Sequence, residues 1–389
     1  MAPDDRRQQP LVEPTLDSRS SLALRLLLIP LAIVFVLGLI EFPAFINVFD
    51  YRTVLGANFA WWPKYNINDP ELIHIRRPYV HFSGETVGGS FIVRHVIPPS
   101  DVTLYRWDVQ CDHNGFRNDK DLQRADIALI GDSFVEGLTV PYDELTSSLL
   151  TRLQGQVVAN LGQSAYGPQQ ELIILKRYAL SLRPRTVIWM FSEGTDLDDV
   201  VYYDRVMHHP PDFWHAFVAR SFTKIMYYRI FHGAKSPGIL RAGFFETPDG
   251  KERAIYFPNE ARPLSKQDLG AIDETAHILA EAHDLSTAQG ARLIVVFVPE
   301  KFRVFQPFCR FPQESQCRGW ALNDLPERFG EAVRSISSDI GYLDLTPSLR
   351  DAARKGAVTY YPDDDHWSPE GHKVAAEAIN RYLSSGQTP

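Results

Sequence analysis

The second half of the chain alternates between short apolar runs and longer segments in which polar and apolar positions are mixed. The apolar runs are rich in β-branched residues and predict buried strands, because a strand covered on both faces carries few polar side chains. We expect strands at 127–130, 157–160, 186–191, 293–298 and 342–345, and helices at 143–153, 168–182, 268–288, 325–336 and 369–383. This alternation predicts an α/β fold with a largely parallel sheet that is covered by helices on both faces.

Two segments break this rhythm. Residues 43–120 contain short β-like runs, such as 89–93 and 102–105, and predict a small β-rich lead-in before the main domain at 121–389. Residues 198–264 are polar and aromatic and predict an insertion. We expect the aromatic side chains of this insertion to be buried in a core, with the lining of an acyl or sugar subsite as the alternative. They are Tyr202, Tyr203, Phe213, Trp214, Phe217, Tyr227 and Tyr228.

Near the N-terminus lies an apolar run from Leu22 to Ile40, with Arg25 as its only charge. A helix needs about 20 apolar residues to cross a hydrocarbon layer about 30 Å thick, so the run predicts one transmembrane anchor over 21–42. A cleaved signal peptide is the first alternative, but no A-x-A-like cleavage site follows the run. A buried core helix is the second, and the length of the run argues against it.

The basic residues around this run predict its orientation. Four arginines lie within the first 25 residues, whereas the 25 residues after Ile40 contain only Arg52 and Lys64. Because basic residues stay on the cytoplasmic side, the main domain is expected outside the cytoplasm. Residues 1–20 are rich in Asp, Arg, Gln and Pro and predict a disordered cytoplasmic tail. We therefore expect a single-pass protein of the cell (inner) membrane whose main domain faces the periplasm or the exterior.

Composition and charge narrow the function classes. The 389 residues are 44% hydrophobic and 12% aromatic, which supplies a packed core and excludes global disorder. A net charge of −8 argues against a nucleic-acid binder that works through a basic field. Cys309 and Cys317 flank a loop that a disulfide could close in an oxidising compartment, with Cys111 left over. Three unpaired thiols are the alternative.

One candidate for chemistry follows directly after the first expected strand, as Gly131-Asp132-Ser133-Phe134. A serine at the carboxyl end of a strand, beside a glycine that permits a sharp turn, lies where open α/β sheets bind their ligands. The segment is not a G-x-S-x-G nucleophile elbow, because position 135 is Val135. Taken alone, the segment is weak evidence, and a solvated turn serine is its default interpretation.

A second candidate lies far downstream, just before the last expected helix. It reads Tyr-Pro-Asp-Asp-Asp-His-Trp-Ser-Pro and contains Asp363, Asp364, His366 and Trp367. An aspartate placed two or three residues before a histidine can hold the imidazole in one tautomer and make it a competent general base. Taken alone, the segment is also compatible with a charged loop in which Ser368 caps the last helix.

Together, the two motifs resemble the SGNH/GDSL hydrolase family, over roughly residues 114–385. The resembling segments follow the expected strands, or precede the last helix, in the order of the family. They are Asn114–Arg117, Gly131–Phe134, Asn160–Gly167, Glu193–Asp196 and the Asp–His block. The resemblance is to the membrane-anchored branch, which is similar to alginate O-acetyltransferase-like proteins. It implies a three-layer SGNH-type sheet, preceded here by one transmembrane helix and the β-rich lead-in.

The resemblance also implies roles for individual residues. Ser133 corresponds to the nucleophile and His366 to the general base. The aspartate of the triad stays open: the spacing D-x-x-H selects Asp363, and the spacing D-x-H-W selects Asp364, which Trp367 favours slightly.

The oxyanion hole implied by the resemblance consists of Ser133, Ala165 and Thr195, and it departs from the family twice. Ala165 stands where the family has Gly, which is tolerable because the donor is a backbone N–H, provided that the backbone angles suit a side chain. Thr195 stands where the family has Asn, and a hydroxyl is shorter than an amide and carries a single proton. Losing one oxyanion donor costs about 10²–10³ in kcat.

We therefore expect a serine esterase or deacylase that acts on O-acyl esters outside the cytoplasm. The substrate is expected to be an O-acylated carbohydrate or a lipid ester, with no cofactor, no metal and no nucleic acid involved. Serine precedes Asp–His here, as in SGNH esterases, whereas alginate O-acetyltransferases have the reverse order, which favours hydrolysis. An O-acyltransferase that acetylates a polysaccharide stays open as an alternative, and so does a non-catalytic glycan-binding module, for which Thr195 is the reason.

Overall fold

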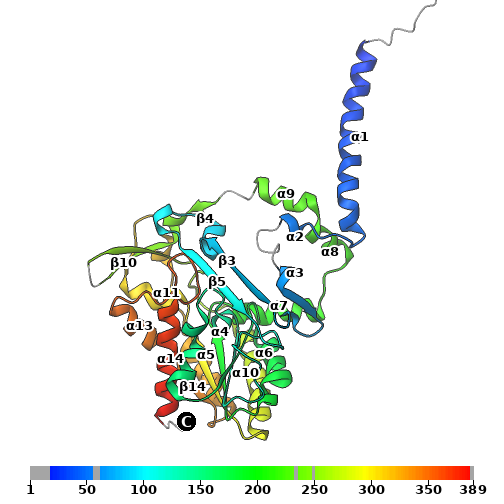
Figure 1. Cartoon of the computed structure of the whole chain (residues 1–389). Helices are drawn as coiled ribbons and strands as arrows, with labels where there is room; N and C mark the ends of the chain where they lie inside the picture. The colour runs from blue at the N-terminus through cyan, green and yellow to red at the C-terminus, as the bar shows by residue number, and fades with distance from the viewer. Residues whose placement is uncertain (1–17, 56–61, 232–234, 248–249, 386–389) are drawn as a thin grey trace, which may run out of the picture. The chain divides into compact units, whose positions relative to one another are not determined.

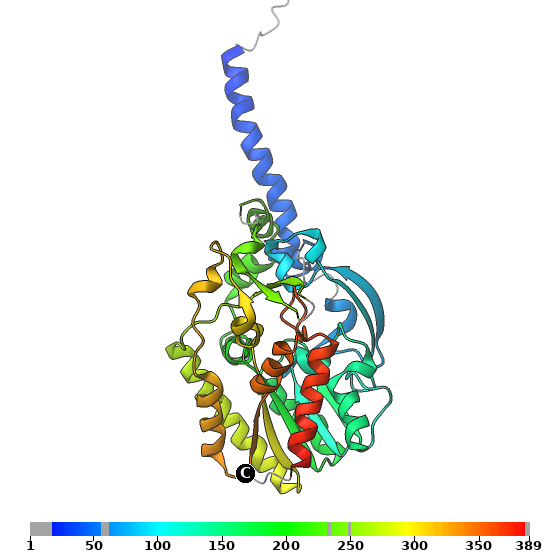
Figure 2. The same cartoon turned by 90° about the vertical axis from the view of Figure 1, so that its left-hand side faces the viewer.

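The computed structural model describes residues 18–55, 62–231, 235–247 and 250–385 (Figures 1 and 2). These residues form two compact units. One unit holds the described parts of 1–60 and 211–232, and the other holds those of 61–210 and 233–389. Most of the expected cytoplasmic tail, residues 1–17, lies outside the described residues.

The larger unit is built around a five-stranded parallel sheet in which all strands except the edge strand β14 are almost entirely buried. The spatial order of the strands is β14-β12-β8-β6-β7. Their bounds are β6 Ile127–Gly131, β7 Val158–Gly162, β8 Thr186–Ser192, β12 Arg292–Val298 and β14 Gly341–Asp344. The chain therefore starts inside the sheet, moves outward to β7 and returns to β8 on the other side of β6. Such a reversal of strand order opens a crevice at the carboxyl ends of β6 and β8, where doubly wound sheets bind ligands.

Helices cover both faces of this sheet, as the sequence predicts. Val187, Trp189 and Phe191 of β8 face one apolar core, whereas Ile188 and Met190 face the other. The first face is covered by α6 (Pro168–Ile174), α10 (Lys266–Ala288) and α12 (Leu325–Ile336), and the second by α5 (Thr146–Gln154), α13 (Thr346–Arg354) and α14 (Pro369–Ser384). The alternation of apolar side chains along each strand thus fills two cores, and the expected three-layer α/β fold is confirmed.

The expected strands and helices all occur, with one exception in regularity. The helix expected at 168–182 is α-helical only to Ile174, continues as a π-turn over 175–179 and ends in a 3₁₀ turn over 180–182. Arg183 then closes it with a left-handed φ of 52°. Two further short helices, α4 (Ser133–Glu136) and α11 (Lys301–Phe305), follow β6 and β12 and have no counterpart among the expected elements.

The segment before the sheet consists of short antiparallel pairs. They are β1 (Asn66–Asp69) with β2 (Ile73–Arg76), which follow the short helix α3 (Trp62–Tyr65), and β3 (His81–Val87) with β5 (Leu104–Gln110). The β-like run expected at 89–93 is wrong, because Ser90–Val93 forms a 3₁₀ turn. Two features account for this turn. Gly88 has a φ of 86°, and the N–H groups of Gly89 and Ser90 donate to side chains that lie far away in the sequence.

The insertion at 198–264 is divided between the two units. In the larger unit it contributes most of α7 (Asp196–His208) and a small sheet in which β10 (Ala242–Glu246) pairs with β11 (Glu252–Tyr256) and β13 (Cys309–Arg310). A minor parallel pair joins β4 (His95–Val96) to β9 (Ser236–Pro237). Residues 61–120 pack within the larger unit, so the packing does not separate the lead-in from the sheet.

The smaller unit contains α1 (Ser18–Phe45), α2 (Arg52–Leu55), α8 (Phe213–Arg220) and α9 (Phe222–Phe231). Within α1, residues 26–45 form a helix long and apolar enough to cross a membrane, and no part of its most apolar window is buried in the protein. This exposure argues against the core-helix alternative, since a core helix would be covered by its own fold.

The three cysteines are free thiols, which is the second of the two alternatives that the sequence leaves open. The expectation that the aromatic side chains of the insertion are buried in a core is wrong for most of them. Of the seven aromatic side chains expected in a core, only Tyr203 is fully buried, and Phe217 is partly covered. The others are exposed; they are Tyr202, Phe213, Trp214, Tyr227 and Tyr228.

Candidate active site

Ser133 lies at the carboxyl end of β6, in the crevice between β6 and β8. The turn that presents it depends on Gly131, where an added Cβ would come within 2.6 Å of the Val135 side chain. Asp132 caps the short helix α4, accepting a hydrogen bond from the Phe134 N–H at 2.8 Å. The nucleophile candidate is therefore the first residue of a helix, where backbone N–H groups have no partner within the helix.

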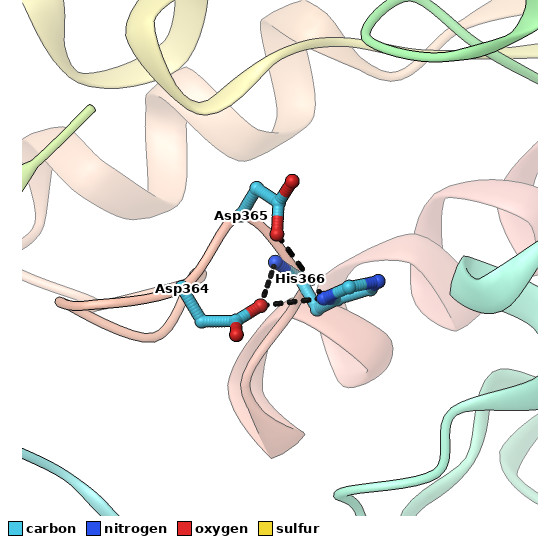
Figure 3. Close-up of side chains that lie close together, drawn as sticks. All are labelled: Asp364, Asp365 and His366. Carbon is cyan, nitrogen blue, oxygen red and sulfur yellow. Dashed lines mark hydrogen bonds and ion pairs between the residues drawn. The ribbon is translucent and has the colours of Figure 1, made fainter. Parts of the chain in front are cut away.

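His366 and Asp364 complete a chain of hydrogen bonds with this serine. The Ser133 hydroxyl lies 2.8 Å from His366 Nε2, and His366 Nδ1 lies 2.5 Å from Asp364 Oδ1. Figure 3 shows the Asp364 carboxylate on the Nδ1 side of the ring. A carboxylate at Nδ1 fixes the tautomer with its proton on that nitrogen, and Nε2 is then free to accept the hydroxyl proton.

Asp363, the other candidate for the triad, points elsewhere. It is fully buried and accepts hydrogen bonds from the Tyr105 hydroxyl at 2.6 Å and from the N–H groups of Gly89 and Thr103. These donors all belong to the β-rich segment before the sheet. The carboxylate of Asp363 therefore fastens the Asp–His loop to that segment, whereas Asp364 contacts the imidazole.

Asp365 adds a second carboxylate beside the imidazole, at 3.3 Å from His366 Nδ1. Burial lowers the pKa of His366, but Asp364 and Asp365 together outweigh burial and hold this pKa well above its usual range. The neutral form of the His366 imidazole, which a general base requires, therefore becomes more populated toward alkaline pH.

The loop that carries these residues is held by groups that the sequence does not mark. Lys301, at the start of α11, is buried and donates to the carbonyl groups of Tyr361, Pro362 and Asp364 at 2.7, 2.7 and 2.9 Å. The Ser90 N–H donates to Asp364 Oδ2 at 2.7 Å. These contacts join parts of the chain that are far apart in sequence, so no local motif reveals them.

Ala165, expected in the oxyanion hole, adopts a left-handed φ of 64°. Its predecessor Ser164 is fixed by Glu136, which accepts the Ser164 N–H at 2.9 Å and also its hydroxyl. Glu136 in turn forms a buried ion pair with Arg76 at 2.7 Å. Alanine is therefore held in a left-handed conformation that suits glycine better, and glycine is the residue that the resemblance to the SGNH family implies at this position.

Thr195, the other expected oxyanion residue, follows β8 on the opposite side of the crevice. Its hydroxyl lies 3.1 Å from Asp132 Oδ2 and 3.4 Å from Asp196 Oδ1. Because a hydroxyl has a single proton, donation to either carboxylate withdraws that proton from an oxyanion. In this arrangement the hydroxyl of Thr195 is directed toward Asp132.

Below Ser133 lies a cluster of buried acidic groups that the sequence did not indicate. Asp132, Glu171 and Asp196 are at most 2% exposed. Burial, followed by the neighbouring Asp132, raises the pKa of Glu171 well above its usual range. Burial, followed by Glu171 and Asp132, does the same to the pKa of Asp196. Burial and the neighbouring acidic groups therefore favour the neutral, protonated forms of Glu171 and Asp196.

A small pocket opens beside the triad, between Thr195 and Asp365. Its apolar walls come mainly from Phe134, Phe257 and Phe302, with Pro258 and Pro299. Asn259 and Glu300 supply polar groups, and burial raises the pKa of Glu300 to about 8. A small pocket with three aromatic side chains and several polar groups suits a small acyl group.

The same loop also has the composition of a cation site. One ligand atom each from Asp364, Asp365 and His366 lies within 4.8 Å of the others. His366, however, already uses Nδ1 toward Asp364 and Nε2 toward Ser133. Both ring nitrogens of His366 are thus used by the hydrogen bonds that a proton-transfer triad needs. A metal ion bound to His366 would have to break one of these bonds.

Residues 254–388 match the family described as SGNH hydrolase-like domain, acetyltransferase AlgX. The "Probable alginate O-acetylase AlgJ" of Pseudomonas putida is 23% identical over 135 residues, or 35% of this chain and 33% of that protein. Its counterpart from Pseudomonas syringae pv. tomato is 24% identical over the same length, or 32% of that protein. The match thus spans about a third of the length of these curated relatives.

Two similar chains are found among solved structures. A lipolytic protein of the G-D-S-L family from Desulfitobacterium hafniense has 14% identity and a TM-score of 0.36, over 66% of this chain and 97% of that one. The acetylxylan esterase Axe2 from Geobacillus stearothermophilus has 12% identity and the same TM-score, over 67% of this chain and 95% of that one.

Proposed function

The chain carries an SGNH hydrolase-like domain related to the alginate O-acetyltransferases, and we propose that it is a serine enzyme that cleaves O-acyl esters outside the cytoplasm. The proposal assigns Ser133 as the nucleophile, His366 as the general base and Asp364 as the residue that orients the base. The observation that carries it is the continuous hydrogen-bond chain from Asp364 through both ring nitrogens of His366 to the Ser133 hydroxyl.

In this mechanism, His366 Nε2 takes the hydroxyl proton while Ser133 Oγ attacks the carbonyl carbon of the ester. The tetrahedral oxyanion is stabilised by the backbone N–H groups of Ser133 and Ala165. The protonated imidazole then passes its proton to the departing alcohol, and an acyl-serine remains. Asp364 stabilises the imidazolium during both transfers.

The second half of the reaction regenerates the serine. His366 takes a proton from water or from a sugar hydroxyl, whose oxygen attacks the acyl-serine, and Ser133 leaves with the proton returned by the imidazole. Water gives an esterase, and a sugar hydroxyl gives an O-acyltransferase. The small aromatic pocket beside Thr195 and Asp365 supports a short acyl group, such as acetyl, in either case.

Two observations bear on the choice of acceptor. Ser133 precedes Asp364 and His366 in the chain, which is the order of SGNH esterases and supports hydrolysis. The relatives are described as alginate O-acetylases, which supports transfer to a polysaccharide. We propose esterase or deacylase activity first and acyl transfer second.

An acceptor experiment distinguishes these activities. The purified full chain is incubated with p-nitrophenyl acetate, with and without alginate oligosaccharides that carry no acetyl groups. An esterase releases acetate at a rate that the oligosaccharide does not change, whereas a transferase yields acetylated oligosaccharide detectable by mass spectrometry. Neither product should form with Ser133→Ala.

The non-catalytic alternative rests on Thr195, and Thr195→Asn tests it. An amide reaches further than a hydroxyl and carries two protons, so one can serve Asp132 while the other serves the oxyanion. An active enzyme should keep or gain rate with this change. A chain that stays inactive both as the natural protein and with Thr195→Asn, while folded, would support the binding module.

A further inference from the structure

Helices α8 and α9 present an exposed aromatic and aliphatic surface that the proposed reaction does not use. In α8, Trp214 is 63% exposed and Val218, one turn further, is also exposed. In α9, Ile230 and Phe231 are 66% and 68% exposed, and Tyr227 lies on the same side at helical spacing. Large apolar side chains gathered on one surface mark an interaction site rather than chance exposure.

The charges of these helices have one sign. Between Phe213 and Phe231 the sequence contains Arg220, Lys224 and Arg229 and no acidic residue, although the whole chain has a net charge of −8. The surface therefore combines aromatic side chains with local positive charge. This combination is complementary to a partner that has both an apolar layer and negatively charged groups beside it.

Both helices are fastened to the end of the candidate membrane helix. The carboxylate of Glu41, in the last turns of α1, accepts the first N–H groups of α9, from Phe222 at 3.2 Å and Thr223 at 2.6 Å. Arg220 Nε, at the end of α8, donates to the Ala44 carbonyl at 2.6 Å. The only acidic side chain of this part of α1 is thus used as a helix cap rather than left facing solvent or lipid.

Aromatic rings make a second connection at the same place. The ring of Phe45, the last residue of α1, lies 5.2 Å from Phe213 and 5.6 Å from Phe217, both in edge-to-face contact. Trp214 packs on the other side of Phe45 at 6.2 Å. Figures 1 and 2 show α8 beside the C-terminal end of α1, so the exposed surface lies where the span leaves the hydrocarbon layer.

We propose that α8 and α9 lie in the headgroup layer of the membrane that α1 crosses, as an interfacial pair of helices fixed to the end of the span. The exposed rings enter the boundary of the acyl chains, where Trp and Tyr are enriched in membrane proteins. Arg220, Lys224 and Arg229 lie at the level of the lipid phosphates. The occupant of this surface is therefore the lipid bilayer, and the proposal rests on α1 crossing it.

Lipid fits this surface better than a protein partner for a geometric reason. Any membrane that contains residues 26–45 of α1 necessarily has its interface at the level of Phe45, against which α8 packs. Because α8 and α9 are attached to the end of α1, their aromatic surface lies at the bilayer wherever α1 crosses it. A second copy of the chain would have to displace lipid from this position.

A fluorescence experiment on the full chain tests this placement. The three native cysteines are replaced by serine, and a single cysteine is introduced as Trp214→Cys or, on the exposed side of α12, as Glu331→Cys. Each variant is labelled with an environment-sensitive nitrobenzoxadiazole dye and reconstituted at one copy per nanodisc with anionic and zwitterionic lipids. Lipids brominated along the acyl chain serve as short-range quenchers.

The proposal predicts blue-shifted emission at position 214 and loss of most of it with brominated lipid, whereas position 331 keeps its emission. Equal, weak quenching at both positions would overturn the proposal. A blue shift at position 214 that appears only when a disc holds several copies of the chain would also overturn the proposal. The occupant of the surface would then be a second copy of the chain.

A second measurement needs no cysteine replacement. The unaltered full chain in nanodiscs with a photoactivatable lipid should be cross-linked within 213–231 as well as within α1. Cross-links confined to α1 would contradict the proposal while confirming that the chain was inserted. Neither readout depends on catalytic activity, so the outcome is independent of the proposed esterase reaction.

Discussion

Asp363 and Asp364 are neighbours in sequence, but their carboxylates make different contacts. Asp364 binds the imidazole of His366, whereas Asp363 binds Tyr105 and two backbone N–H groups of the segment before the sheet. The sequence leaves the choice between them open because both spacings to His366 occur in the family. The choice depends on which direction each side chain takes from the loop, and that depends on distant partners.

Replacing these two aspartates separately should therefore give different defects. Asp364→Asn should lower kcat by about 10³–10⁴-fold, because the amide no longer fixes the tautomer or stabilises the imidazolium. It should also move the rising, acid-side limb of the pH profile to lower pH, since Asp364 raises the pKa of His366. Ester hydrolysis measured from pH 5 to 9 checks both effects.

Asp363→Asn is the matched control in the same loop. It should reduce thermal stability by about 1–3 kcal/mol, the cost of a disturbed buried polar group, and leave the position of the pH limb unchanged. A larger loss of kcat in Asp363→Asn than in Asp364→Asn would reverse the assignment.

Ala165 gives a second prediction at the scale of one residue. Its φ of 64° is a left-handed conformation in which a Cβ is unfavourable. Ala165→Gly should therefore stabilise the protein by up to about 1 kcal/mol, because relief of this strain exceeds the extra entropy of glycine in the unfolded chain. Denaturant unfolding measures the change. Destabilisation by a similar amount would mean that the alanine side chain makes contacts worth more than the strain.

At the scale of elements, the regular strands and helices of the sheet domain follow from the sequence, and the connections to the active site do not. The strands are apolar over most of their length and the helices are periodic, so the local pattern suffices for both. In contrast, Lys301 binds carbonyl groups about 60 residues away, and Ser90 binds a carboxylate 274 residues away. Such contacts have no local signature.

The aromatic insertion failed as a prediction for a related reason. Pattern alone treats aromatic side chains as candidates for a core, because burial in protein is their most frequent use. The helices α8 and α9 instead carry them on an exposed surface at the end of α1. The relevant signal is the absence of acidic residues between Phe213 and Phe231, and it becomes meaningful only once the place of these helices in the fold is known.

The contacts of α11 with the Asp–His loop give a prediction at this scale. Lys301→Met removes the donor that satisfies three carbonyl groups, so the loop that carries Asp364 and His366 should lose its fixed position. We expect destabilisation of about 1–3 kcal/mol and a fall in kcat with little change in KM. Thermal unfolding and ester hydrolysis kinetics measure the two effects.

The control for this change is Lys355→Met. Lys355 is exposed and pairs only with a neighbouring aspartate one turn away. Its loss should change stability by less than about 0.5 kcal/mol and leave kcat unaltered. Equal effects of the two methionine variants would exclude a positioning role for Lys301.

At the scale of the whole molecule, the buried acidic groups couple stability to pH. Burial raises the pKa of Asp199 to about 7, and the pKa values of Glu171 and Asp196 lie well above their usual range. The folded chain therefore keeps protons that the unfolded chain has released above about pH 4–5. Stability should accordingly fall as pH rises from 5 to 7. Lys301, whose pKa burial lowers to about 7, opposes this trend only at higher pH.

Glu171→Gln tests this origin of the pH dependence. Glutamine stays neutral, so the loss of unfolding free energy between pH 5 and 7 should shrink by about 1 kcal/mol or more, the value of one pKa unit. Denaturant unfolding of the full chain in detergent at both pH values gives the difference. Glu331→Gln, at an exposed position, should leave the loss unchanged, and the account fails if the two variants behave alike.

The central claim is that Ser133 is the nucleophile, and covalent labelling tests it most directly. The purified full chain is treated with a fluorophosphonate, which forms a stable phosphonyl ester with an activated serine and releases fluoride, and the digested protein is analysed by mass spectrometry. The account predicts one adduct, on the peptide that contains Ser133, absent from Ser133→Ala and much slower to form in His366→Ala. A folded protein that gains no adduct, or gains it on another serine, would contradict the claim.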